Sequence, residues 1–137
     1  ALTGGGTITM TRLYPKRCIT PTVKPTQSDC IWAAGFIDGE AWLGMRPQRT
    51  RPGGKTYWYP GITVAQVVRA PIAWLRDRWG GSLHIRKNHT GHLGKKDQYV
   101  WQAQGVLVEY LLQDIGRYLK IKHLPDTSES TIHTEEE

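Results

Sequence analysis

The sequence contains only two cysteines, Cys18 and Cys30, among its 137 residues, and it has no long hydrophobic run. Two thiols provide neither a zinc-site spacing nor a disulfide framework, which favours an intracellular, reducing compartment. No stretch approaches the roughly 18 consecutive apolar residues of a membrane span. No signal-peptide pattern is present either. We therefore expect no membrane partner.

Several familiar catalytic patterns are also missing. The Gly4-Gly5-Gly6 run lacks the lysine and the helix that follow a phosphate-binding loop. No Ser/His/Asp set is evident, and the histidines show no metal-ligand spacing. These five histidines are His84, His89, His92, His123 and His133.

The charge is unevenly distributed along the chain. Residues 1–125 hold all 18 Lys and Arg but only 7 of the 12 acids, a formal charge of +11. A positive charge of this size on a small domain favours binding to a polyanionic partner over a basic surface that is only solvated. We divide the chain into a basic Gly/Pro/Thr-rich arm (1–27), a domain (28–125) and an acidic, disordered tail (126–137). The arm is either disordered or packed along the domain.

The stretch 28–45 contains a short apolar helix. Ser28 or Asp29 can cap its N-terminus by accepting hydrogen bonds from the first-turn amides. Gly35 and Gly39, four residues apart, lie on one helical face. Their missing side chains favour close contact with another backbone there.

Two acids, Asp38 and Glu40, follow the apolar run. Acids near the negative end of a helix dipole are unfavourable unless they face a cation or a partner. After Glu40, Leu43 and Met45 alternate with Gly44 and polar residues, as in a half-buried strand. The helix therefore delivers an acid to the start of a strand.

The rest of the sequence alternates between hairpins and helices. The pattern predicts strands at 41–48, 57–68, 82–88 and about 97–104, and helices at 70–79 and 106–118. Pro60-Gly61 predicts a bend or bulge within the second strand. This order predicts an α+β fold with one four-stranded antiparallel sheet and helices on one of its faces.

The sheet face away from the core is rich in base-reading and phosphate-binding side chains. Arginine pairs with guanine, and Asn or Gln with adenine, in the major groove, which admits a two-stranded ribbon. Each such residue alone is an ordinary solvated side chain, but two hairpins with the same bias favour duplex DNA. The candidates are Arg46, Gln48, Arg49, Arg51, Lys55, Tyr57, Tyr59, Thr63, Arg69, His84, Arg86, Asn88, Lys96 and Gln98, with Lys95 and Gln102 beside them.

Residues 33–41, AAGFIDGEA, resemble the nine-residue motif of the LAGLIDADG homing endonucleases. Two positions depart from it, because Ala33 stands for the first leucine and Ala41 for the final glycine. The element order αββαββα over about 28–122 is also that of one LAGLIDADG domain. The resemblance implies intron homing, with a nuclease that binds a long pseudo-palindromic DNA site through its sheet. It implies hydrolysis of both strands with Mg²⁺, for which Mn²⁺ can substitute.

The resemblance also implies roles for single residues. Glu40 takes the position of the metal-binding acid, with the Gly39 carbonyl as an additional ligand, and Asp38 supports the helix end. Gln66 matches the glutamine that organises active-site water, and Lys122 matches the basic residue near the scissile phosphate. Read without the resemblance, Gln66 is a strand-edge glutamine and Lys122 complements a helix dipole.

A single motif provides half a site, so the resemblance implies a homodimer. Its motif helices would pack together through Ala34, Gly35, Asp38 and Gly39, and two-fold symmetry would match a pseudo-palindromic site. The alternative is a nucleic-acid-binding module on this fold without cleavage, such as a maturase or regulator with intron RNA as a partner. Ala41 leaves that alternative open.

Overall fold

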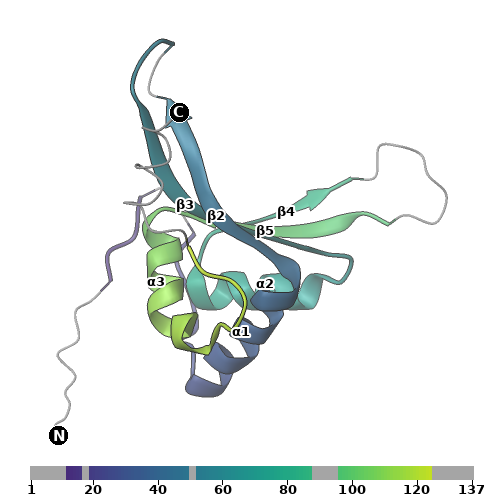
Figure 1. Ribbon diagram of the computed structural model, residues 1–137. Helices are drawn as coiled ribbons and strands as arrows, with labels where there is room; N and C mark the ends of the chain where they lie inside the picture. Colours follow the sequence, from purple (N-terminus) through teal and green to yellow (C-terminus); the bar gives the residue numbers. More distant parts are fainter. Residues whose placement is uncertain (1–11, 17–18, 50–51, 88–95, 125–137) are drawn as a thin grey trace, which may run out of the picture.

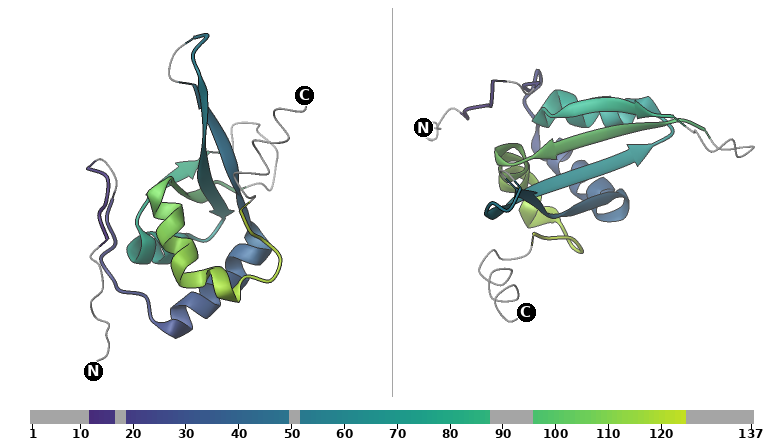
Figure 2. Two further views of the ribbon diagram at one scale, coloured as in Figure 1. Left: turned by 60° about the vertical axis from the view of Figure 1, so that its left-hand side comes forward. Right: turned by 90° about the horizontal axis from the view of Figure 1, so that it is seen from above.

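The computed structural model describes residues 12–16, 19–49, 52–87 and 96–124 and shows a sheet with helices on one face (Figures 1 and 2). The predicted element order and α+β fold class are confirmed. In chain order the elements are α1 (Gln27–Glu40), β2 (Ala41–Arg49), β3 (Thr56–Gln66), α2 (Arg69–Trp79), β4 (Ser82–Arg86), β5 (Gln98–Gln104), α3 (Val106–Ile115) and the 3₁₀ helix η1 (Gly116–Tyr118).

The four strands lie in the order β2-β3-β5-β4, and all neighbours are antiparallel. The hairpins β2/β3 and β4/β5 project in different directions beyond the helices (Figure 1). The β2/β3 register runs without interruption from Ala41↔Val64 to Arg49↔Thr56, so the bulge expected at Pro60-Gly61 is wrong. Pro60 lies where β3 has a neighbour on one side only, because β5 pairs with β3 from Gly61 onward. An edge of this kind tolerates proline.

Alternation along the strands gives the sheet one buried face. Ile62, Val64 and Trp101 point toward the helices and are almost fully buried. The indole N–H of Trp101 donates to the Gly80 carbonyl at 2.7 Å. The helices complete this core with apolar side chains that include Ala33, Ile37, Ile72, Leu75, Trp79, Val108, Leu111 and Ile115.

The start of α1 differs from the sequence prediction. Thr26, and not Ser28 or Asp29, is the N-cap, and its hydroxyl accepts from the Asp29 amide at 3.1 Å. Asp29 in turn accepts from the Thr26 amide, which completes a capping box. The Thr26 amide and the Arg78 guanidinium, 3.0 Å away, hold the pKa of Asp29 below its ordinary value. Asp29 therefore joins the start of α1 to α2.

The described part of the N-terminal arm packs on the domain. Arg12 makes an ion pair with Asp114 at 2.7 Å, and this hydrogen bond raises the pKa of Arg12. Tyr14 packs edge-on against Tyr110 of α3. Asp114 also accepts from the Trp79 indole at 2.8 Å, so it links the arm, α3 and α2. Within the described residues, the packed form of the arm is the one observed.

Several boundaries differ from prediction by a few residues. β3 ends at Gln66 instead of 68, β4 ends at Arg86, and α3 ends at Ile115 before η1. Asn88, Lys95, Arg51 and the predicted acidic tail (126–137) lie outside the described residues. Among residues 12–16, 19–49, 52–87 and 96–124, no helix has both the length and the hydrophobicity needed to span a bilayer.

The links made by Asp114 lead to a stability prediction. Asp114→Ala removes the partner of Arg12 and leaves the Trp79 indole N–H unpaired, which should cost about 1–3 kcal/mol of unfolding free energy. Urea denaturation measures this loss, and faster tryptic cleavage after Arg12 would report release of the arm. Glu109→Ala on the exposed side of α3 is the matched control. Equal stability of the two variants would contradict this account.

Candidate active site and nucleic-acid face

Two segments far apart in the sequence contact the end of α1, where it runs into β2. Glu40 is the last residue of α1, Gln66 is the last of β3, and Lys122 follows η1. Because Ala41 pairs with Val64, the end of β3 lies beside the end of α1. Gln66 Nε2 donates to Glu40 Oε1 at 2.6 Å. The structure thus brings the predicted Glu40 and Gln66 into direct contact.

Lys122 reaches this place through Asp38. The Asp38 carboxylate accepts from three consecutive main-chain amides, those of Lys120 (2.7 Å), Ile121 (3.1 Å) and Lys122 (2.9 Å). The Lys122 ammonium then donates to the Asp38 main-chain carbonyl at 2.6 Å. Asp38, two residues before Glu40 in the sequence, therefore fixes both the main chain and the ammonium of Lys122. Asp38 was predicted to support the helix end; its carboxylate is seen to hold the segment 120–122 that follows η1.

The pKa of Asp38 reflects this arrangement. Desolvation by burial raises the pKa, but the amides of Lys120, Lys122 and Ile121 and the Lys122 charge outweigh it. The net result is a pKa below the ordinary value for aspartate. Asp38 is consequently ionised at neutral pH and offsets the lysine charge beside it.

The oxygen atoms at this junction are of the type that a hard divalent cation prefers as ligands. Glu40 is exposed, and its hydrogen bond with Gln66 uses one carboxylate oxygen. The Gly39 carbonyl belongs to the last turn of α1, where carbonyls lack intrahelical partners. Magnesium takes such oxygen ligands from one or two carboxylates and keeps several waters. Within the described residues no group of three His, Cys, Asp or Glu side chains gathers that could hold a metal ion.

The open face of the sheet carries the predicted nucleic-acid contacts. Strand register places Arg46, Tyr59, Thr63, His84 and Gln98 on the face opposite Ile62 and Trp101. On the same face lie Gln48, Tyr57, Arg86 and Gln102, and Arg86 donates to Gln98 at 3.3 Å. In the part of the chain that the structure describes, the helices lie on the other face of the sheet (Figure 2).

Other candidates lie away from this face. Arg49 ends β2, Lys55 precedes β3, and Lys96 precedes β5, so all three are exposed near hairpin ends. Arg69 begins α2 in the helical layer, three residues after Gln66. Basic side chains therefore lie near the ends of the hairpins and at the start of α2, as well as on the open face of the sheet.

Sequence reasoning missed Trp42. Its side chain is 45% exposed on the open face, and the Arg46 guanidinium lies 4.3 Å from its ring centroid. The signal was present, because Leu43 and Met45 were assigned inward and Trp42 must then point outward.

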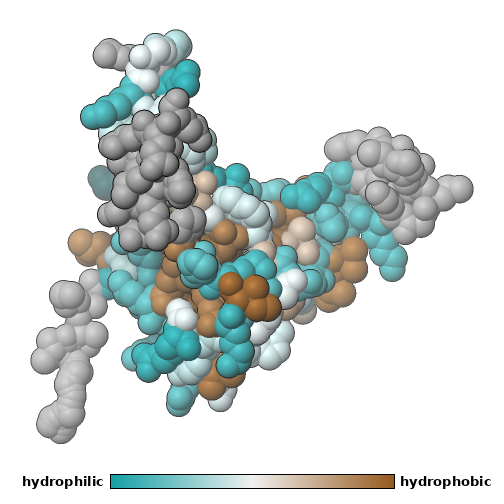
Figure 3. Space-filling model, viewed as in Figure 1, coloured by the Kyte–Doolittle hydropathy of each residue, from teal (hydrophilic) through white to brown (hydrophobic). Residues whose placement is uncertain are grey.

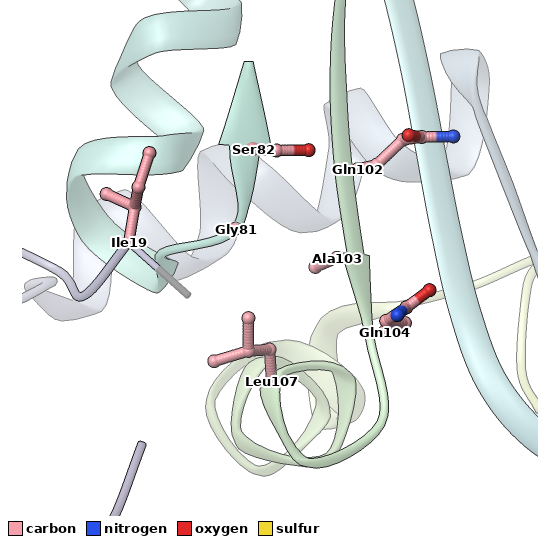
Figure 4. Close-up of a pocket in the computed structure, with 7 residues that line it drawn as sticks. All are labelled: Ile19, Gly81, Ser82, Gln102, Ala103, Gln104 and Leu107. Atoms are coloured by element: carbon pink, nitrogen blue, oxygen red, sulfur yellow. The ribbon is translucent and has the colours of Figure 1, made fainter. Parts of the chain in front are cut away.

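A pocket of about 340 Å³ lies at the far end of β5 from Gln66 (Figure 4). Gln102 and Gln104 point to one side of β5 there, while Ala103 points to the other. Leu107, Ile19, Gly81 and Ser82 complete its lining, which includes no carboxylate, histidine, lysine or arginine. We therefore assign no catalytic or metal-binding role to these lining residues.

The exposed side of α1 matches the predicted glycine face with one correction. An added Cβ at Gly35 or Gly39 would meet nothing within 4 Å, so both present open backbone. Ala34, however, is fully buried in the core of its own chain, and its expected place in a dimer interface is wrong. The reason is that Ala34 lies beside Ala33 and Ile37 on the inward side of the helix.

The depressed pKa of Asp38 gives a pH prediction. A carboxylate with a lowered folded-state pKa stabilises the fold above its unfolded pKa, near 3.9, and this stabilisation is lost as pH falls through the folded value. Asp38→Asn should therefore be less stable than the wild type at pH 7, with the gap closing toward pH 3. Urea denaturation across this range measures the gap, and a gap independent of pH would contradict the assignment.

The fold was compared with proteins of known structure. No protein-family model and no curated protein matches the sequence. The homing endonuclease I-CvuI, in complex with the I-CreI target and Mg, matches with a TM-score of 0.53 and 18% identity over 69% of this chain and 58% of that chain. The archaeal intron-encoded homing endonuclease I-Vdi141I, complexed with DNA, matches with a TM-score of 0.50 and 19% identity over 69% and 60%.

The chain thus spans less than two thirds of these two proteins. The α+β fold with its antiparallel four-stranded sheet agrees with this likeness. The chain has the fold of the LAGLIDADG homing endonucleases.

Proposed function

We propose that this chain is a LAGLIDADG homing endonuclease that binds a long pseudo-palindromic DNA site and cleaves both strands. The observation that carries the proposal is that Gln66 binds Glu40 and Lys122 binds the main chain of Asp38, so that both partners come from distant segments to the last turn of the same helix. Packing of the fold alone does not require the exposed Glu40 carboxylate to be hydrogen-bonded to Gln66, or the Lys122 ammonium to be held on the same helix end. The structures similar to this chain include endonucleases solved with DNA, which supports the same ligand.

Each residue supplies one element of phosphodiester hydrolysis. Glu40, with the Gly39 carbonyl, would hold a magnesium or manganese ion, and the metal would supply polarisation of the phosphate and activation of water. Gln66 orients the Glu40 carboxylate through its 2.6 Å hydrogen bond and can also order water. Lys122 offers positive charge to the scissile phosphate as negative charge develops there.

A homodimer would complete the site. Gly35 and Gly39 leave open backbone on α1, and Ile31 beside them is 50% exposed. Ile121 is 72% exposed, and Asp38 fixes its main chain against the same helix. Hydrophobic side chains are visible on the helical layer in Figure 3. Pairing two such surfaces would bury these isoleucines and bring two Glu40 carboxylates together.

Cleavage of a randomised duplex library tests the function. The protein is incubated with Mg²⁺, with Mn²⁺ or with EDTA, and both cut ends are sequenced. Metal-dependent cuts at one long, roughly palindromic site are expected. Selective binding of DNA or RNA without cuts in any metal would favour the non-cleaving maturase or regulator instead.

The first variant prediction concerns Glu40. Glu40→Gln keeps the shape of the side chain but removes its charge, so cleavage should fall by at least about 100-fold while DNA affinity stays within about twofold. Single-turnover cleavage and gel-shift titration measure the two quantities. Glu109→Gln, an exposed carboxylate change on α3, should leave both unchanged. Equal loss of binding and cleavage in Glu40→Gln would mean that Glu40 is structural.

The second variant prediction concerns the dimer. Ile121→Asp would place a charge where the proposed interface buries an isoleucine, each burial contributing about 1.5–3 kcal/mol. We expect a dimeric wild type and a monomeric Ile121→Asp in sedimentation at micromolar concentration. Leu13→Asp, at another exposed apolar residue, should remain dimeric. A monomeric wild type bound to DNA would refute the two-chain site.

A further inference from the structure

The open face of the sheet contains a pair of opposed glycines. Gly44 of β2 and Gly61 of β3 are register partners and leave a patch of bare backbone. Neither has a positive φ, so backbone conformation does not require glycine at either position. The reason for these glycines lies in the side chains above them.

Two side chains fill the patch from neighbouring positions on β2. A Cβ at Gly44 would lie 2.9 Å from Cζ2 of Trp42, and a Cβ at Gly61 would lie 2.9 Å from Nε of Arg46. The Trp42 indole and the Arg46 side chain therefore lie flat on the sheet. They meet there, with the guanidinium carbon 4.3 Å from the indole centroid.

Thr63 completes the restraint on Arg46. Nη2 of Arg46 donates to the Thr63 hydroxyl at 3.0 Å, and Thr63 is the register partner of Trp42. The guanidinium is thus stacked on one face and hydrogen-bonded at one corner. A guanidinium carries five N–H donors, so this contact leaves others for a ligand.

Such a restraint changes what the arginine can do. A free surface arginine loses rotamer freedom when it binds, whereas a stacked one has already lost it. Bidentate donation to guanine O6 and N7 requires a fixed guanidinium plane. Among the described residues, Arg86 is the other arginine on this face, and it donates to Gln98 without lying over an aromatic ring.

We propose that Trp42 is a positioning residue that holds Arg46 to read one guanine in each half-site. This inference rests on the proposed DNA-binding function and adds the identity of a base and the residue that enforces it. Because Gly44 and Gly61 have no side chains, Trp42 and Arg46 can lie flat against the backbone there. A strand rises about 3.3 Å per residue, so Arg46 lies roughly 17 Å along β2 from Ala41, beside Glu40. The guanine therefore belongs to the inner part of the half-site.

Selection of bound duplexes from a randomised library tests the proposal. The wild type should enrich one guanine that Arg46→Ala reduces by roughly ten- to hundredfold. Trp42→Leu should weaken the same preference by about two- to thirtyfold and leave other positions unchanged. Gly61→Ala, which displaces Arg46 without backbone strain, should act like Trp42→Leu. The double variant Trp42→Leu/Arg46→Ala should equal Arg46→Ala alone.

Controls separate this effect from general damage. Trp58→Leu changes an equally exposed tryptophan on the other face of β3 and should leave the base profile intact. Arg86→Ala should alter a different position. An unchanged guanine preference in Trp42→Leu, or in Arg46→Ala, overturns the proposal while DNA binding stands. Absence of selective duplex binding by the wild type overturns the proposed function and this inference together.

A measurement on the free protein checks the restraint itself. In ¹⁵N-arginine side-chain NMR, the Arg46 guanidinium should rotate slowly in the wild type and in Trp58→Leu. Rotation should be fast in Trp42→Leu and in Gly61→Ala. Equal rotation rates in all four proteins would show that Trp42 does not hold Arg46.

Discussion

The carboxylate of Asp38 is the contact on which the candidate site depends. It accepts three consecutive main-chain amides, from Lys120 to Lys122, and so ties the segment after η1 to the end of α1. The Lys122 ammonium adds a second contact to the same residue, because it donates to the Asp38 main-chain carbonyl. A single ionised side chain thus links a position 84 residues away in sequence to the motif helix.

The register between β2 and β3 is the second constraint on the candidate site. α1 passes directly into β2, so Glu40 cannot move independently of the strand that begins at Ala41. The Ala41↔Val64 pairing then places Gln66 beside Glu40. A shift of one residue in this ladder would turn Gln66 to the other face and also expose Ile62 and Val64. Burial of the core and assembly of the site therefore require the same register.

Much of the fold and part of the site were predictable from local patterns. The apolar run before Asp38 identified a helix, and the alternation in 98–104 and the spacing of Ile72, Leu75 and Trp79 each identified an element and its inward face. The N-cap was predicted two or three residues too late, because Thr26 lies outside the apolar run and was not considered with Asp29 as a reciprocal pair. Pro60-Gly61 suggested a bulge because the sequence does not show that Arg46 lies over Gly61.

The sequence by itself determined the order of the elements, the α+β class and the outward bias of the basic strand positions, because periodicity and charge are local properties. Only the tertiary structure decided which distant groups meet. Strand register decides that Gln66 binds Glu40 and that Trp42 and Arg46 pack over the paired glycines. The path of the chain after η1 decides that Asp38 binds the amides of residues 120–122. The burial of Ala34 was decided in the same way, since which side of α1 faces the core depends on how the helices pack on the sheet.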